Sequence, residues 1–572
     1  MFRKNKRHLQ PPLISSVSQL SAKHRQRLDD SWAGEFYREF FCRLKEEPFA
    51  AMYADGPSRP NIPVNVLVGL ETLKAGFGWS DEELYDHFNY DLQVRYALGL
   101  HELGQGDFEL RTLYNFRQRL SHHNLQHATN LLAQAFADIT DAQLLAFQVD
   151  TRQQRMDSTQ VASNILDASR LQLLVEAVQR LWRGLTEADQ ARYQADFAPY
   201  VQHSSGQYVY RVKGRPATVE HLQQIGRLLH RLLTELAPRY GQEPVYAICQ
   251  RFLADNFHIL PTEIQPKANS EISAGCLQSL DDLEASYRVK SGQAYKGYVA
   301  NVTETCEPNN PLQLITSVQV APNTTEDSSL MVEAVPALKA RMELDSLHTD
   351  GAFASPAGDE VLLAHHVTQI QTALRGPAPD PQHFGLADFS FDRPADGVPQ
   401  QITCPAGLTG SIRWGREGSG LVADFDPAVC QACVFHQTGR CRAKPGKRDT
   451  RFHLDFYLDE VHTAQRRQAC WAQKRTGTNL RVAVEATMRV IKHPFPAGKL
   501  PVRGLFRVTA LLIGSALMTN VRRLHAYRQA QRVKPPQSTA DQPSAFPFLM
   551  AAIRGWTRLL RFGYSPSVLS RS

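Results

Sequence analysis

The sequence predicts a mixed α/β protein in which a helical unit precedes the sheet. Residues 64–121 carry helical patterns, and a β-like segment follows around 144–161. Alternating residues at 295–303 and 312–320 predict two neighbouring strands; "SSLMVEAVPALKARM" then predicts a helix and "LDSLHTD" a short strand. Strand, strand, strand, helix, strand is the order of a mixed α/β sheet.

Composition and charge limit the class of protein. The chain has 572 residues, 42% hydrophobic and 21% charged, so it is globular and long enough for several packed units. The net charge of +7 is uneven, because the segment from Pro501 to the end holds eleven basic residues but only one acid, Asp541. Clustered basic residues favour a polyanionic partner such as nucleic acid. The alternative is a solvated basic tail without a defined partner.

The sequence carries no sign of export or of a membrane span. The start, "MFRKNKRHLQPPL", is basic but has no apolar core behind it, which predicts a cytoplasmic protein. The longest apolar run, 508–521, is too short to cross a bilayer and predicts a buried helix. Nine cysteines, an odd number and mostly scattered, argue against a disulfide framework.

The helical unit is predicted to hold three helices and to form an N-terminal domain of residues 1–135. The first is "VNVLVGLETLKAGF", the second begins at "SDEELYDHF" with Ser80 and Glu83 as a capping box, and the third is "TLYNFRQRL". In the third, Arg117 and Arg119 stand among aromatic residues. They are candidate DNA contacts, with core packing of this segment as the alternative.

The rest of the chain divides into four predicted parts. Residues 136–372 form the first part of the sheet domain, with a helical insertion at about 165–285. Residues 373–455 are a cysteine-rich insertion that begins with an irregular, Pro- and Gly-rich connection. Residues 456–530 complete the sheet domain. After a break at 534–547, the basic tail of residues 531–572 ends in a short helix.

Three carboxylates stand at positions that suit a metal site. Asp157 in "RMDSTQV" and Asp350 in "LHTDGAF" each follow an apolar segment, and Glu485 lies on the amphipathic helix of 479–494. Three such groups can hold two Mg²⁺ or Mn²⁺ ions that catalyse in-line phosphoryl transfer. Each also has an ordinary explanation as a turn, a cap or a charged helix face. Asp150 competes with Asp157 for the first position.

Several segments together resemble the DDE transposases of bacterial insertion sequences, and most of all the branch called IS-eleven-eighty-two. These are "RMDSTQVASN", "LHTDGAF", the series R-x3-E-x6-K formed by Arg481, Glu485 and Lys492, and then "LPVRGLFRV" and "LMTNVRRL". The resemblance extends from the N-terminal helices to about residue 525. It implies a ribonuclease-H-like mixed sheet in which Asp157, Asp350 and Glu485 form the metal-binding triad.

The resemblance also implies the partner. Double-stranded DNA, both the element ends and the target, would lie against the triad, with Arg481, Arg489 and Lys492 on phosphates. We expect several copies of the chain to assemble on that DNA. One position departs from the pattern: Thr478 stands where related transposases have a tyrosine three residues before the arginine.

Four cysteines in the second insertion form a candidate structural zinc site. Cys430 and Cys433 are spaced as C-x2-C, with Cys404 before them and Cys441 after them; His436 is a substitute ligand. The alternative is a set of unliganded cytosolic thiols. Similar cysteines occur in the transposase branch named above.

Three functions remain open from the sequence. The favoured one is a Mg²⁺-dependent transposase that cleaves at its terminal inverted repeats and joins the 3′ ends to target DNA. A related nuclease or an inactive remnant is the second. A zinc-containing DNA-binding regulator without catalysis is the third.

Overall fold

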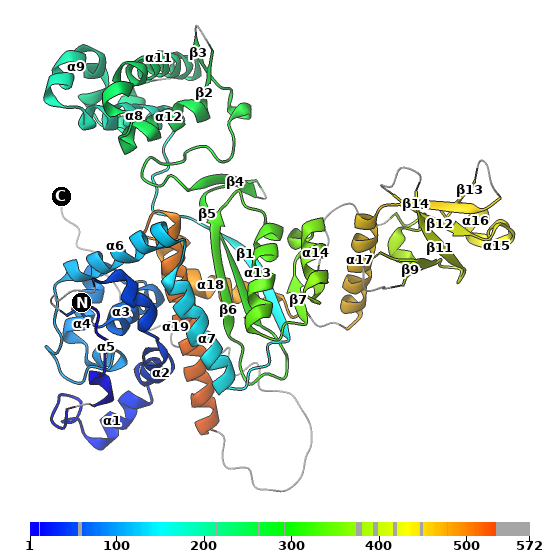
Figure 1. The fold of residues 1–572 in the computed structure, drawn as a ribbon, viewed down its shortest axis with the longest axis horizontal. Helices are drawn as coiled ribbons and strands as arrows, with labels where there is room; N and C mark the ends of the chain where they lie inside the picture. The colour runs from blue at the N-terminus through cyan, green and yellow to red at the C-terminus, as the bar shows by residue number, and fades with distance from the viewer. Residues whose placement is uncertain are drawn as a thin grey trace, which may run out of the picture. The chain divides into compact units, whose positions relative to one another are not determined.

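The structure is a computed structural model that describes residues 1–10, 12–54, 60–212, 214–260, 263–290, 292–372, 380–392, 398–415, 420–446, 450–476 and 479–533. Its contacts divide the chain into residues 1–525 and 526–572. Thr478 and the predicted break and helix after residue 533 lie outside the described residues. The mixed α/β class predicted from the sequence is confirmed (Figure 1).

The N-terminal part of the chain is helical. Its elements are η1 (Arg7–Leu9), α1 (Ala22–Asp29), α2 (Trp32–Glu39), η2 (Phe41–Arg43), η3 (Glu47–Met52), α3 (Val64–Phe77), α4 (Asp81–Tyr90), α5 (Leu92–Ala97), α6 (Leu110–His127) and α7 (Leu131–Ala146). The capping box of Ser80 and Glu83 is confirmed at the start of α4. One prediction is wrong: residues 64–121 hold four helices, because Asp91 is extended and its carboxylate caps the separate helix α5.

A six-stranded sheet follows the helices. Its strands are β1 (Gln153–Val161), β4 (Ser286–Lys290), β5 (Gln293–Thr305), β6 (Ile315–Pro322), β7 (Ser346–Thr349) and β8 (Thr368–Gln371). They run in the order β4-β5-β1-β7-β8, with β6 also paired to β5. The pairs of β5 with β1, β4 and β6 are antiparallel, whereas β1, β7 and β8 are parallel.

Helices pack against the two faces of this sheet and against its end strand β8. They are α13 (Asp327–Arg341), η5 (Gly351–Phe353), α14 (Pro356–Ala364), α17 (Leu458–Thr476), α18 (Val482–Lys492), η7 (Pro496–Gly498) and α19 (Leu505–Val533). On one face, Met156 and Leu347 pack with Met331 of α13. On the other, Val302 belongs to a cluster that includes Met488 of α18. The apolar run 508–521 is the buried helix that the sequence predicts, and no helix among the described residues could span a membrane.

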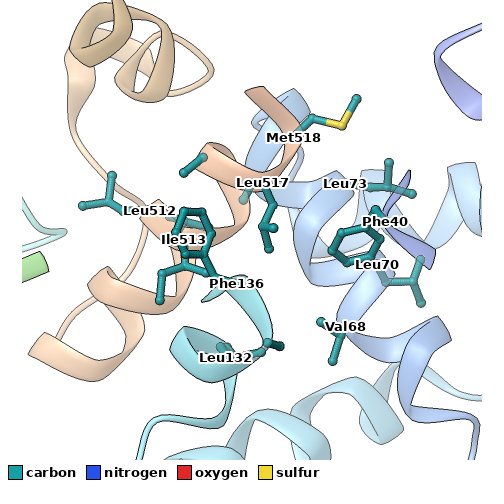
Figure 2. Packing of buried hydrophobic residues seen from close by; sticks show 14 of the residues in the cluster. Phe40, Val68, Leu70, Leu73, Leu132, Phe136, Leu512, Ile513, Leu517 and Met518 are labelled. Carbon is teal, nitrogen blue, oxygen red and sulfur yellow. The ribbon is translucent and has the colours of Figure 1, made fainter. Parts of the chain in front are cut away.

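Helix α19 shares one core with the N-terminal helices. Figure 2 shows Leu512 and Ile513 beside Phe136 of α7, and Leu517 between them and Leu70 and Leu73 of α3. The contact with α3 is close, since a Cβ on Gly514 would lie 2.8 Å from the Cβ of Ala75. A side chain at Gly514 would therefore force these two helices apart.

Two further segments of the chain each contain a hydrophobic cluster of their own. The first comprises α8 (Arg170–Gly184), α9 (Glu187–Val201), α10 (Ser205–Arg211), α11 (Arg215–Tyr240), α12 (Pro244–Asn256), β2 (Phe257–Ile259), β3 (Ile264–Pro266) and η4 (Asn269–Glu271). The second comprises η6 (Leu386–Asp388), β9 (Ser390–Phe391), β10 (Gln401–Thr403), β11 (Thr409–Trp414), β12 (Leu421–Phe425), α15 (Pro427–Ala432), α16 (Val434–Gln437), β13 (Lys444–Pro445) and β14 (Phe452–Phe456).

The cysteine-rich segment has a sheet and an apolar core that the sequence does not reveal. Its strands run in the order β13-β14-β12-β11-β10-β9. Phe389, Ile402, Phe425 and Phe452 are almost fully buried in it. Most of these strands are too short for alternation to be read from the sequence.

Candidate active site

The first carboxylate, Asp157, is nearly buried in the middle of β1. Its Oδ1 accepts a hydrogen bond from the Ser158 amide at 2.9 Å, and its Oδ2 lies 3.1 Å from Nη1 of Arg481. Burial raises the pKa of Asp157 to about 6; Arg481 opposes this shift, whereas the charges of Asp350 and Glu485 add to it. Both other carboxylates thus contribute to the raised pKa of this group.

The second carboxylate, Asp350, follows directly after β7. Strand β7 is parallel to β1, and Arg155 faces His348 across the pair. Asp157 and Asp350 each lie two residues further along, so they belong to the same face of the sheet. Asp350 also caps the short helix η5, since its Oδ1 accepts from the Ala352 amide at 2.8 Å. A strand end and a cap thus hold this carboxylate in place.

The third carboxylate, Glu485, projects from the first turn of α18. Helix α18 packs through the buried residues Val484, Met488 and Ile491, which leaves Glu485 on the opposite, polar side. Its side chain is 57% exposed, and Oε1 accepts from Nη2 of Arg481 at 2.9 Å. Arg481 therefore bridges Glu485 and Asp157.

The three carboxylates line one open cavity of about 420 Å³. The other residues of its wall include four cations, Lys290, Arg481, Arg489 and Lys492, together with Ser158, Thr159 and Met488. Three carboxylates that share one cavity with four cations suit a ligand that carries both a divalent cation and phosphates.

The donor chemistry of the cavity fits Mg²⁺ or Mn²⁺, because all three candidate ligands are carboxylates. A nearby cation would stabilise the ionised form of Asp157, whose pKa is raised by burial. Arg481 supplies part of that charge from between Asp157 and Glu485. In the described part of the chain, no three His, Cys, Asp or Glu side chains stand as a ready-made metal site.

Asp150, the competitor of Asp157, lies outside this arrangement. It precedes β1, and its carboxylate accepts a hydrogen bond from Nε of Arg152 at 2.9 Å. It does not line the cavity that holds Asp350 and Glu485. The structure therefore brings Asp157, and not Asp150, together with the other two carboxylates.

The basic residues of α18 differ in their surroundings. Lys492 is half-buried and donates to Oγ1 of Thr159 at 2.7 Å; burial lowers its pKa. Arg489 is exposed at the cavity and forms no ion pair with any residue that the structure describes. The Arg489 side chain is thus free to bind a phosphate, whereas the Lys492 ammonium already donates a hydrogen bond to Thr159 of β1.

Arg117 and Arg119 also have partners within the N-terminal helices. Arg117 donates to Glu71 of α3 at 2.7 Å and to Asp81 of α4 at 2.6 Å. Arg119 lies over the ring of Tyr53, 5.0 Å from its centroid. Arg117 therefore joins three helices, and its contact with DNA stays a prediction.

The four cysteines of the predicted zinc site line one small hollow in the cysteine-rich segment, and His436 lies in the same wall. Burial raises the pKa of the Cys430 thiol to about 11, and Cys441, Cys404 and Cys433 contribute to the shift. All four are free thiols in this structure. A set of four sulfurs suits tetrahedral zinc, which would lower these thiol pKa values.

Sequence reasoning missed several residues around the cavity. Lys290 comes from the end of β4, far from the motifs in the sequence. Glu304 of β5 lies fully buried under α18, and the charges of Arg523 and Arg155 hold its pKa below the usual value although burial opposes this. The only signal was a charged residue inside a strand whose last residues are otherwise apolar or uncharged, "VANVTET".

Comparison with known families bears on the N-terminal helices. Residues 29–119 match the model of a family described as "Transposase domain (DUF772)". Neither curated proteins nor solved structures give a significant match. The matched residues run from the end of α1 into α6 and do not include the carboxylates. The match therefore supports the transposase class independently of the cavity.

Proposed function

We propose that the chain is a DDE transposase, similar to the IS-eleven-eighty-two branch, which cleaves DNA at the terminal inverted repeats of its element and joins the 3′ ends to target DNA. One observation carries the proposal: Asp157, Asp350 and Glu485, distant in sequence, line a single cavity. The transposase match over residues 29–119 agrees with it and makes DNA the partner.

The sheet supports a ribonuclease-H-like core as part of this proposal. The order β6-β5-β1-β7-β8, antiparallel in its first three strands and parallel in its last three, is the order expected of such a core. Asp157 lies on the central strand and Asp350 at the end of its parallel neighbour. Asp157 and Asp350, far apart in the chain, thereby lie side by side on one face of the sheet.

The proposed cofactor is a pair of Mg²⁺ or Mn²⁺ ions held by Asp157, Asp350 and Glu485. When bound, such ions activate water or a 3′-hydroxyl and stabilise the leaving oxygen of the phosphoryl group. The residues of the chain position the DNA: Arg489 and Lys290 are exposed at the cavity and suit phosphates on either side of the scissile bond. Arg481 would release its two carboxylates and become a third phosphate contact.

The proposed zinc ion, held by Cys404, Cys430, Cys433 and Cys441, would be structural. Its ligands lie in the cysteine-rich segment, apart from the cavity-lining residues, and a closed set of four leaves no position for substrate. Because this segment has its own apolar core, zinc would add to its stability rather than replace a missing core.

The experiment that tests the proposal uses purified full-length protein and duplexes from both flanks of the gene. We expect strand cleavage that requires Mg²⁺ or Mn²⁺ and stops on chelation, and joining of a pre-cut end to a second duplex. Cleavage without joining would identify a nuclease. Binding without cleavage at any metal concentration would identify a DNA-binding regulator or an inactive remnant. The Asp157→Asn variant is the control against contaminating nucleases.

A further inference from the structure

A buried ion cluster lies beneath α18. The carboxylate of Glu304 is fully buried, and its Oε1 accepts from Nε of Arg155 at 2.7 Å. Its Oε2 accepts from Nη1 of Arg523 at 2.7 Å and from the hydroxyl of Thr487 at 2.8 Å. One carboxylate therefore joins β1, β5, α18 and α19.

The cluster forms hydrogen bonds with the chain both before and after Glu485. Thr487, two residues after Glu485, is 3% exposed and binds Glu304. Before the helix, Nη1 of Arg155 donates to the backbone carbonyl of Leu480 at 2.8 Å. Arg523 also binds the Thr487 hydroxyl, at 2.5 Å, so both cations act on the helix that carries the third carboxylate.

The same cluster is connected to Asp157 because Arg155 lies on the same strand, β1. Arg155 and Asp157 are alternate residues of β1 and belong to one face of the sheet. Glu304 is the register partner of Arg155 across the β1 and β5 pair. These buried polar bonds therefore link the position of Glu485 to that of Asp157, in addition to the apolar contacts of α18 and the bond from Lys492 to Thr159.

We propose that Glu304, with Arg155, Arg523 and Thr487, is a positioning cluster that sets the placement of Glu485 relative to Asp157 and thereby the affinity of the cavity for divalent metal. This proposal rests on the proposed function. None of the four residues lines the cavity, so none is a metal ligand or a substrate contact. Groups that orient metal ligands from behind typically change metal affinity by about 10–100-fold when they are replaced.

The test replaces the Thr487 hydroxyl with minimal change of shape. Thr487→Val removes both hydrogen bonds at nearly constant volume and helix propensity, whereas Thr487→Ser keeps the hydroxyl. Thr72→Val is the matched control, because Thr72 is a helical threonine, 2% exposed, whose hydroxyl donates to Val68 O at 2.9 Å in the distant helix α3. Glu304→Gln is a second variant; if it folds, it should weaken Mn²⁺ binding in the same direction as Thr487→Val.

The first measurement is Mn²⁺ binding to the full chain without DNA, by electron paramagnetic resonance. We expect Thr487→Val to weaken binding about tenfold, with Thr487→Ser and Thr72→Val close to wild type. A general loss of stability would not produce this pattern, since both threonine-to-valine changes remove a buried hydroxyl. Wild-type Mn²⁺ affinity in Thr487→Val would overturn the proposal.

The second measurement separates this proposal from the proposed function. Amide hydrogen exchange over residues 482–492 should rise about tenfold in Thr487→Val and stay near wild type in Thr487→Ser and Thr72→Val. Should wild type bind no Mn²⁺, the metal chemistry fails and exchange alone decides the positioning role. Unchanged exchange in Thr487→Val would then refute that role.

Discussion

Replacement of Glu485 by glutamine tests the proposed catalytic role of this carboxylate with little expected effect on folding. The side chain is 57% exposed, and its one ion pair, with Arg481, spans a single turn of α18. Pairs with this i,i+4 spacing contribute about 0.3–0.5 kcal/mol on helix surfaces. Arg481 also keeps its bond to Asp157 in the variant, and the glutamine oxygen can still accept from it. We therefore expect the free energy of unfolding to change by less than about 0.5 kcal/mol.

The effect on activity should be far larger. A metal-bound carboxylate contributes several kcal/mol of transition-state stabilisation, and about 4 kcal/mol corresponds to a rate loss of about a thousandfold. Asp157→Asn and Asp350→Asn should cause similar losses, and a double variant should lose little more, if the three carboxylates share metal ions as proposed. Asp150→Asn, which alters a carboxylate outside the cavity, is the matched control and should stay active.

The assay measures cleavage of flanking-DNA duplexes at a series of Mg²⁺ concentrations, beside DNA binding by fluorescence anisotropy. Glu485→Gln should bind DNA as wild type does and cleave it at least about a thousandfold more slowly. Near-normal Mg²⁺-dependent cleavage by Glu485→Gln would show that α18 presents only a charged surface, and the transposase mechanism would fall with it.

Three further predictions concern other parts of the chain. Metal analysis should find about one zinc per chain, lost when Cys430→Ser and Cys433→Ser are combined; a metal-free but fully folded wild type would contradict it. Burial raises the pKa of Asp81, but hydrogen bonds from Arg117 and Lys74 outweigh it and lower that pKa to about 2. Because this folded-state pKa lies below the ordinary 3.8, the pair stabilises the fold above about pH 4, and the stabilisation is lost as pH falls towards 2. Arg117→Ala should thus cost about 2 kcal/mol in denaturant unfolding at pH 7 and less at pH 3, and an equal cost at both would refute this assignment. Arg117→Ala with Arg119→Ala should also flatten the salt dependence of DNA affinity if these residues bind phosphates, whereas an unchanged slope places the DNA elsewhere.

Local patterns in the sequence predicted the elements that local chemistry determines. The capping box of Ser80 and Glu83 and the buried helix over 508–521 depend on neighbouring residues, and both are present. Asp157, Asp350 and Glu485 could be selected because each sits in a recognisable short motif. That they line one cavity is a result of strand order, which the motifs do not contain.

Contacts between distant segments could not be predicted in this way. Glu304 reads as one polar residue near a strand end, and nothing near it in the sequence indicates Arg523, which binds it from 219 residues further on. Arg117 is a second example, in which the sequence suggested a function that distant partners make less direct. A basic residue among aromatics looks available for DNA, yet its carboxylate partners lie 36 and 46 residues away.

The core of the N-terminal helices can be completed only late in synthesis, because α19 forms part of it. Arg522 donates a hydrogen bond to the carbonyl of Gly76, which lies 446 residues earlier. During synthesis the apolar faces of α3 and α7 therefore stay uncovered until residues 505–525 have left the ribosome. The same helix delivers Arg523 to the cluster under α18. A chain without these residues would lack both the cover of its N-terminal helices and a support of Glu485, and would be a target for proteolysis. Prematurely terminated copies should therefore be cleared rather than persist as proteins that occupy DNA without acting on it.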